Sequence, residues 1–367
     1  MKKNLFLSLL FVIGAMTYVS CDKADNPAPV NPDEPDIEVP DEPSELETRY
    51  FSIEDARYIA ENFPLATIEE FIQGLNVNLH AIKGGTNLIQ VSTEKGYTEF
   101  YIGAKNVPGY FLWTPSAGRG QGEGGGGALT ENDLYKIAIL FSTLLDDELT
   151  LVISAKDANN DVTKPMEIVI SFVETKTEVG DLNVNLFFSN DKDVDLHLIL
   201  PDGTRIFYGN RGGSYEAENG EIKSFGLDLD SNPACNIDGI RNENIFIPAQ
   251  LVQNGTYTVQ VDMYANCNYS LATDWQVIAR YNDELLTNEI ADERFAGRNP
   301  VMGIYPAGVG NGDHTPVMQF TITNAEEHSV GAPRLIRSTF KPTPLKDTDW
   351  AKLSDEEYEA AVKREQK

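Results

Sequence analysis

The sequence predicts a mainly β protein built from two antiparallel β-sandwich domains behind a disordered acidic linker, with minor short helices. Many short segments alternate apolar and polar residues, as half-buried antiparallel strands do. These segments follow one another without the strand–helix rhythm of a parallel α/β sheet. A length of 367 residues also exceeds one ordinary core, so we expect two β-rich halves.

The composition is that of a folded, strongly acidic chain. Hydrophobic residues make up 41% and charged residues 23%. The chain has 29 Lys and Arg against 57 Asp and Glu, a formal net charge of −28. Nucleic acid is bound mainly through basic side chains that neutralise phosphates, so we expect no nucleic-acid partner.

The amino terminus, residues 1–20, predicts a secretory signal peptide. Lys2 and Lys3 precede an apolar run over residues 5–16 that is too short to span a bilayer, which needs about 20 residues. Cys21 directly follows Ser20, which resembles the lipobox of bacterial lipoproteins. That resemblance implies acylation of Cys21 and a membrane anchor made of lipid. Tyr18 departs from the Leu or Val usual in that family, and an ordinary cleaved signal peptide is the alternative.

Residues 21–49 predict a disordered tether. Residues 22–48 hold ten acidic residues, one Lys and six Pro, a composition that cannot bury a core and that keeps the chain extended. Acidic stretches behind a lipidated Cys resemble export signals of surface lipoproteins in Bacteroides-type bacteria. The resemblance implies an outer-membrane lipoprotein of the cell envelope, exposed at the surface. A solvated spacer is the alternative.

The first β-rich domain is expected over residues 50–178. Two capping patterns predict short helices over residues 52–63 and 67–75. Residues 134–145 are open between helix and strand, and the Gly-rich segment 118–127 predicts a connector. Predicted strands cover residues 77–82, 88–92, 98–102, 110–113, 148–154 and 166–172. The last two, joined by a polar turn, resemble the closing hairpin of bacterial immunoglobulin-like modules.

The second domain is expected over residues 179–325, as an immunoglobulin-like or jelly-roll-like sandwich. A tail over residues 326–367 contains a predicted helix at 354–366. Period two places Asp193, Asp195 and His197 on the strand face opposite an apolar face. Predicted strands cover residues 182–186, 194–200, 205–208, 244–247, 256–264, 275–281 and 318–323.

A set of acidic side chains predicts a Ca²⁺ site in this domain. Carboxylates gathered on one surface repel one another unless a cation neutralises them, and Ca²⁺ takes 6–8 oxygen ligands. An EF-hand is excluded, because Pro233 and Gly239 occupy positions that need Gly and Glu. The alternative is that these side chains hydrogen-bond backbone groups at turns. The candidate ligands are Asp193, Asp195, Asp228 and Asp230, with Asn232 and Asp238 as further ligands.

Cys235 and Cys267 are the two cysteines left once Cys21 is acylated. The envelope is oxidising, so we expect them to form a disulfide. A loop of this length stabilises the fold by about 3–4 kcal/mol on the chain-entropy estimate. His197 is read either as a ligand or base or, more simply, as a structural hydrogen-bond partner.

The second domain contains an ordered set of motifs: DVDLH at 193–197, PDG at 201–203, GLDLDSN at 226–232, CNIDG at 235–239, NEN at 242–244, GTYTV at 255–259 and NC at 266–267. This set resembles the YfaP-like domain of unknown function found in secreted and cell-surface bacterial proteins. The resemblance covers residues 182–323, under half of the chain, and implies a surface location without naming an activity.

Together these observations predict a non-enzymatic cell-envelope lipoprotein with a Ca²⁺-stabilised β-sandwich, acting in surface binding or adhesion to an unknown protein or glycan. A glycan-binding accessory lipoprotein is the alternative, and a hydrolase using Asp195 and Asp228 as acid and base is a third reading. Sugar stacking would need exposed aromatic side chains, for which the candidates are Tyr110, Trp113, Tyr215 and Trp275.

Overall fold

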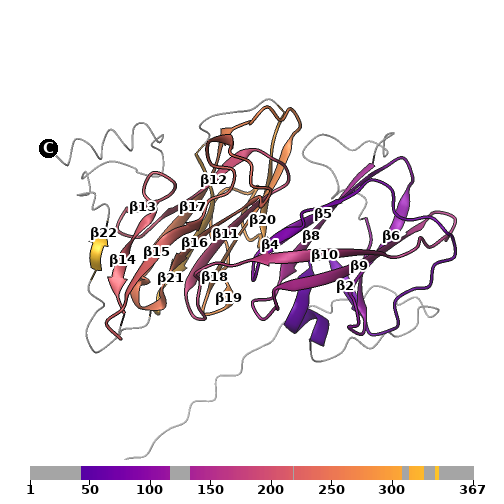
Figure 1. The fold of residues 1–367 in the computed structure, drawn as a ribbon, viewed down its shortest axis with the longest axis horizontal. Coiled ribbons are helices and arrows are strands. Elements are labelled where there is room, and N and C mark those ends of the chain that lie inside the picture. Colours follow the sequence, from indigo (N-terminus) through magenta and orange to yellow (C-terminus); the bar gives the residue numbers. More distant parts are fainter. Residues whose placement is uncertain (1–42, 116–132, 218, 308–313, 326–334, 339–367) are drawn as a thin grey trace, which may run out of the picture. The chain divides into compact units, whose positions relative to one another are not determined.

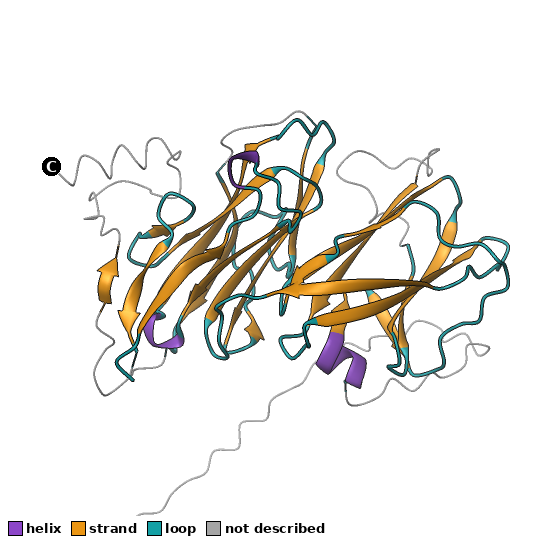
Figure 2. Cartoon of the chain, viewed as in Figure 1, coloured by secondary structure: helices purple, strands orange, loops and turns teal. Residues whose placement is uncertain are grey.

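The computed structural model describes residues 43–115, 133–217, 219–307, 314–325 and 335–338. The predicted signal peptide, Cys21, the Gly-rich segment 118–127 and the helix expected at 354–366 lie outside the described residues. Within the described residues strands predominate and helical turns are short (Figure 2). The predicted mainly β fold class, with antiparallel β-sandwiches, is therefore confirmed.

The first sandwich packs two sheets around one apolar core (Figure 1). One sheet has the order β1–β8–β5–β3, with β1 (Phe51–Ile53), β8 (Asp133–Phe141), β5 (Thr86–Thr93) and β3 (Leu75–Val77). The facing sheet has the order β2–β7–β6–β9–β10–β4, with β2 (Ala56–Ile59), β7 (Tyr110–Trp113), β6 (Tyr97–Ala104), β9 (Glu148–Asp157), β10 (Met166–Val173) and β4 (His80–Ile82). The pairing of β4 with β10 is parallel. The ambiguous segment 134–145 is thus mostly strand.

The two helices expected near the start of this domain are wrong. Residues 52–63 contain the end of β1 and the whole of β2 instead, and residues 67–75 are irregular up to the start of β3. The reason is period two: Phe51 and Ile53 alternate with a polar residue and are buried against the facing sheet. Core contacts here outweigh the local capping signals.

The end of the predicted tether is ordered. Leu46 is fully buried in the core of the first sandwich, within the short π-helical turn η1 (Leu46–Tyr50). Glu47 accepts hydrogen bonds from the backbone amide and the hydroxyl of Ser44. Of the disordered tether expected over residues 21–49, the part over 43–49 is therefore wrong, because Leu46 occupies a core position, and residues 21–42 lie outside the described residues.

The second sandwich begins with β11. The last strand of the first sandwich, β10, ends at Val173, and β11 begins at Leu182. Its larger sheet has the order β19–β18–β11–β16–β15–β14–β22, and β20 also pairs with β18. These strands are β19 (Glu284–Leu285), β18 (Thr273–Tyr281), β11 (Leu182–Phe188), β16 (Asn242–Ile247), β15 (Ile222–Leu229), β14 (Gly212–Glu216), β22 (Leu335–Ser338) and β20 (Val301–Tyr305). Because β22 pairs with β14, part of the expected tail belongs to this sheet.

The smaller sheet has the order β13–β12–β17–β21 and closes the second core. Its strands are β13 (Arg205–Ile206), β12 (Asp193–Ile199), β17 (Gly255–Ala265) and β21 (Thr315–Ile322). Two further turns are η2 (Pro233–Cys235) and η3 (Ala249–Leu251). The core is apolar and draws on both sheets, with inward residues from β11, β16 and β18 facing those of β12, β17 and β21. In the described part of the chain, no helix is long and apolar enough to cross a membrane.

A buried tyrosine ties a loop to this core. The Tyr257 ring stacks on Phe320, with centroids 5.2 Å apart. Its hydroxyl donates to the Gln253 carbonyl at 2.9 Å and accepts from the Gln253 amide at 2.7 Å. One side chain therefore satisfies both backbone groups of a loop residue.

We expect Tyr257→Phe to lower the free energy of unfolding by about 1–3 kcal/mol, because it leaves the Gln253 backbone groups without their partner. Guanidinium denaturation followed by circular dichroism measures the change. Tyr269→Phe is the matched control, since Tyr269 is exposed. An effect of Tyr257→Phe no larger than that of Tyr269→Phe would contradict the assigned role.

Candidate metal centre

The polar face of β12 is buried. Val194, Leu196 and Leu198 point into the apolar core, and Asp193, Asp195 and His197 lie on the other face, as period two predicts. These three polar residues are only 1%, 4% and 0% exposed. Ionised side chains are rarely buried without a compensating partner, so this face is a candidate functional site.

The turn η2 packs on β12 and β17 and covers part of this face. A disulfide between Cys235, at the end of η2, and Cys267, just after β17, holds the turn in place. The expected disulfide is therefore present, with its Cα atoms 5.2 Å apart. The amides of Ala234 and Cys235 are close enough to Asp193 to favour its ionised form.

Three carboxylates, two from strands and one from the residue after a third strand, converge beside Asp193. Asp195 comes from β12, Asp230 from the residue after β15, and Glu243 from β16. One oxygen of each lies within 4.8 Å of those of the other two. The Glu243 carboxylate also accepts the Leu196 amide at 2.7 Å through Oε2. We call Asp195, Asp230 and Glu243 the carboxylate trio.

Two oxygens of the trio are buried with no hydrogen-bond partner among the described residues. They are Oε1 of Glu243, a residue 1% exposed, and Oδ1 of Asp230. The other Asp230 oxygen is 2.5 Å from the Arg211 guanidinium. A buried acceptor without a donor costs about 1–3 kcal/mol, and more when it is charged. These two oxygens therefore have free coordination capacity that a cation can use.

Burial and mutual repulsion dominate the electrostatics of the site. Burial raises the pKa of Glu243 well above its usual value, and the charges of Asp195 and Asp230 raise it further. Burial also raises the pKa of Asp193 to about 6, against the opposing effect of the Ala234 and Cys235 amides. Arg211 compensates part of the charge of Asp230, and the burial and mutual repulsion of the other acids make the group a candidate site for a divalent cation.

Asp193 lies beside the trio, whereas the predicted ligand Asp228 makes contacts of its own. Asp228 accepts the Asn244 side-chain amide at 2.6 Å and the Lys176 backbone amide at 2.6 Å. A register shift between Leu227 and Leu229 places Asp228 in a bulge, so it does not keep step with Asp230. The acid that meets Asp195 is thus Asp230 or Glu243, and Asp228, the partner expected for Asp195 in a hydrolase, is not in this group.

Asn232 and Asp238 make hydrogen bonds within and around their own loop. The Asn232 side chain donates to the Lys192 carbonyl at 2.8 Å and accepts the Asp238 amide at 3.0 Å. The Asp238 carboxylate accepts the Ser231 hydroxyl at 2.7 Å and the Ile240 amide at 2.8 Å. For these two residues the turn interpretation holds, and their hydrogen bonds shape the loop that carries η2.

Glu243 is the member of the trio that sequence reasoning missed. The available signal is its strand position, because Glu243 shares the inward face of β16 with the core residues Ile245 and Ile247. An acidic residue on the same strand face as buried aliphatic residues lowers the stability of the fold. Such an acidic residue is therefore a candidate for a functional role.

The four aromatic candidates for sugar stacking are not exposed platforms. Tyr110, Tyr215 and Trp275 are buried. Trp113 is half-buried and packs edge-on against Phe100, with ring centroids 5.7 Å apart. Each serves packing within its own sandwich, so these residues do not support glycan binding.

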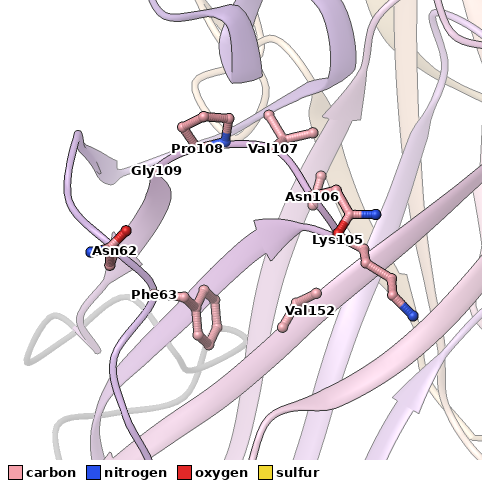
Figure 3. Close-up of a pocket in the computed structure, with 9 residues that line it drawn as sticks. Asn62, Phe63, Lys105, Asn106, Val107, Pro108, Gly109 and Val152 are labelled. Carbon is pink, nitrogen blue, oxygen red and sulfur yellow. The ribbon is translucent and has the colours of Figure 1, made fainter.

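A small open pocket of about 200 Å³ lies in the first sandwich (Figure 3). Phe63, Val107 and Val152 give it apolar walls, and Asn62 and Asn106 lie at its rim. The ammonium group of Lys105 is held by Glu167 at 2.6 Å. The pocket therefore lacks a free charged group, and no titratable cluster faces it among the described residues.

Comparison with known proteins adds little. No family model matches the chain, and no curated protein matches it. Among solved structures, the D00-D0 domain of Intimin is 12% identical, covers 51% of this chain and 91% of its own length, and superposes with a TM-score of 0.16. A likeness this weak carries no functional argument.

Without added metal, the raised pKa values predict that the protein is more stable at mildly acidic pH. Asp193 and Glu243 favour protonation when folded, so their contribution is fully present below their unfolded pKa values near 4. It is lost as the pH rises through about 6 for Asp193 and higher for Glu243. Thermal melting in EDTA should show Tm higher by roughly 3–6 °C at pH 6 than at pH 8.

Glu243→Gln tests the origin of this slope, since it removes a titrating group while keeping an acceptor for the Leu196 amide. The variant should show a smaller difference in Tm between pH 6 and pH 8 than the native chain. Asp181, whose pKa burial also raises to about 6, stays intact in the variant and supplies the remaining slope. A Tm that falls from pH 8 to pH 6 in both proteins would refute the assignment.

Proposed function

We propose that the chain is a non-enzymatic, lipid-anchored protein of the outer membrane, whose second β-sandwich binds Ca²⁺ and which acts in surface binding or adhesion. The carboxylate trio carries the Ca²⁺ part of the proposal. Asp195, Asp230 and Glu243 supply convergent hard oxygen ligands, two of them with buried oxygens that lack partners in the described part of the chain.

Ca²⁺ suits this site better than Mg²⁺. Ca²⁺ accepts 6–8 oxygens in flexible geometry, whereas Mg²⁺ demands near-ideal octahedral geometry and keeps several waters. The trio is largely buried and drawn from three separate strands, so it offers carboxylates rather than room for a full hydration shell. Asp193 adds a nearby charge that favours a divalent cation.

The proposed location rests on the amino-terminal sequence. Cys21 behind an apolar run supports acylation, and the acidic, Pro-rich residues that follow support a spacer between the lipid and the sandwiches. Membership of the YfaP-like domains, proposed for residues 182–323, fits a cell-surface role, because those domains occur in secreted and surface proteins. The partner, protein or glycan, would be met by the sandwiches beyond the spacer.

We expect Ca²⁺ to bind the protein with one site per chain and to raise its Tm. A ligand at 100 times its Kd stabilises the folded state by about 2.7 kcal/mol, which corresponds to roughly 5–10 °C for a domain of this size. Isothermal titration calorimetry measures the binding, and thermal melting with and without EDTA measures the stabilisation.

Two variants make this test specific. Glu243→Gln should abolish the heat of Ca²⁺ binding, because it removes a charged ligand while keeping the side-chain shape. Asp228→Asn is the matched control, since Asp228 is a nearby acid outside the trio, and it should keep the Ca²⁺ response. The site is refuted if the native protein shows no heat of Ca²⁺ binding and no Tm shift, or if the two variants respond equally to Ca²⁺.

The surface role is tested in whole cells of a Gram-negative host. The native chain should incorporate labelled palmitate, be cleaved by protease added to intact cells, and increase adherence to immobilised extracellular proteins or glycans. Cys21→Ser should lose the label and move to the soluble fraction, because the anchor is lipid. If Cys21→Ser stays in the membrane, or if native cells adhere no better than cells lacking the chain, the proposed role is wrong.

A further inference from the structure

A second group of metal-ligating side chains lies on the buried polar face of β12 that also carries Asp195, but it shares no residue with the trio. His197 comes from β12, Asp262 from β17 and His314 from the residue before β21. A ligand atom from each lies within 4.8 Å of those from the other two. We call these residues the histidine cluster.

Strand pairing brings this group together. β12 and β17 run antiparallel, with Asp195 opposite Asp262 and His197 opposite Gln260, so His197 and Asp262 are diagonal neighbours on one face. The Gln260 side chain donates to the His314 carbonyl at 3.0 Å, which holds the third member over the same face. The arrangement thus follows from sheet register and one side-chain hydrogen bond.

The distances suit a small metal ion. His314 Nδ1 is 3.7 Å from Asp262 Oδ2, and the His197 and His314 ring centroids are 5.2 Å apart. Ligand bonds of about 2.0–2.2 Å to Zn²⁺ place tetrahedral ligand atoms roughly 3.3–3.6 Å apart. Shifts of about 1 Å or less in these side chains would complete three protein ligands.

The surroundings keep His197 in the form that binds metals. Burial lowers the pKa of His197 well below 6.5, and the charge of Arg205 and the neighbouring His314 lower it further. The Arg205 guanidinium itself donates to Gln260 at 2.9 Å and lies over the Phe207 ring. Asp262 supplies the negative charge that a divalent cation needs, and Asp195 lies opposite it on β12.

We propose that His197, Asp262 and His314 form a binding site for a transition-metal ion of the Zn²⁺ class, separate from the Ca²⁺ site. Two imidazoles and one carboxylate favour such ions, whereas Ca²⁺ selects oxygen ligands. The His314 and Asp262 side chains are 8% and 3% exposed, so the site is largely shielded from solvent and leaves a water molecule or a further ligand to complete the coordination.

The test uses Co²⁺ as a spectroscopic stand-in for Zn²⁺, with excess Ca²⁺ present so that the carboxylate trio is filled. The full-length protein should bind one Co²⁺ with visible ligand-field bands typical of nitrogen and oxygen ligands, and Zn²⁺ should displace it. His314→Gln and Asp262→Asn should each weaken Zn²⁺ binding by more than about 10-fold, the lower end of what even outer-shell changes cause. Circular dichroism checks that the variants are folded.

Two controls separate this site from the proposed Ca²⁺ site. His80→Gln, in β4 of the first sandwich, should leave the Co²⁺ bands unchanged. Glu243→Gln should lose Ca²⁺ binding and keep the Co²⁺ bands, and His314→Gln should do the reverse. The inference is overturned if the native protein gives no bands and no heat with Zn²⁺, or if folded His314→Gln and Asp262→Asn bind Zn²⁺ as the native chain does.

Discussion

The second sandwich is organised around the burial of carboxylates beside β12. Taking an ionised group out of water costs several kcal/mol even after the surroundings relax, so each of these acids needs compensation. Part of it comes from the chain: the Leu196 amide donates to Glu243, and Arg211 pairs with Asp230. These contacts leave the raised pKa of Glu243 in place. A bound divalent cation would compensate the negative charge that these contacts leave. The neighbouring loops must therefore keep the carboxylates in place despite their mutual repulsion.

The loop over residues 231–241 and the disulfide hold the backbone beside these carboxylates. Asn232 and Asp238 hold each other and the nearby backbone, so the loop has a defined shape without any helix or strand of length. The bond between Cys235 and Cys267 then ties η2 to the end of β17. Closing a loop of this size stabilises a fold mainly by restricting the unfolded chain. Here it also keeps the Ala234 and Cys235 amides over Asp193, so stability and local electrostatics depend on the same bond.

Period-two alternation of apolar and polar residues predicts most of the strands correctly. Helix-capping patterns fail where tertiary contacts outweigh them. The alternation around Val194 and Leu196 correctly separates core from polar face, because a strand has only two faces. The capping pattern after Ser52 failed because Phe51 and Ile53 are buried as strand residues. The candidate site was half found: Asp195 and Asp230 belong to the trio, but a bulge removes Asp228 from step with Asp230. Bulges and the pairing of distant strands, which brings Glu243 in, are not encoded in any short window of sequence.

The two clusters also constrain each other, because strand β12 contributes to both. Asp195 and His197 are two residues apart, about 7 Å along an antiparallel strand. At that separation two divalent ions would repel each other, and only the surrounding anionic groups can offset this repulsion. Asp195 and Asp262, one from each cluster, are paired across β12 and β17 and supply negative charge that offsets part of this repulsion. The chemical division is equally sharp, since the trio offers oxygen alone and the histidine cluster offers mainly nitrogen. Period-two alternation thus places one residue of each cluster, Asp195 and His197, on the same face of β12, and the paired Asp195 and Asp262 carboxylates would reduce the cost of filling both sites.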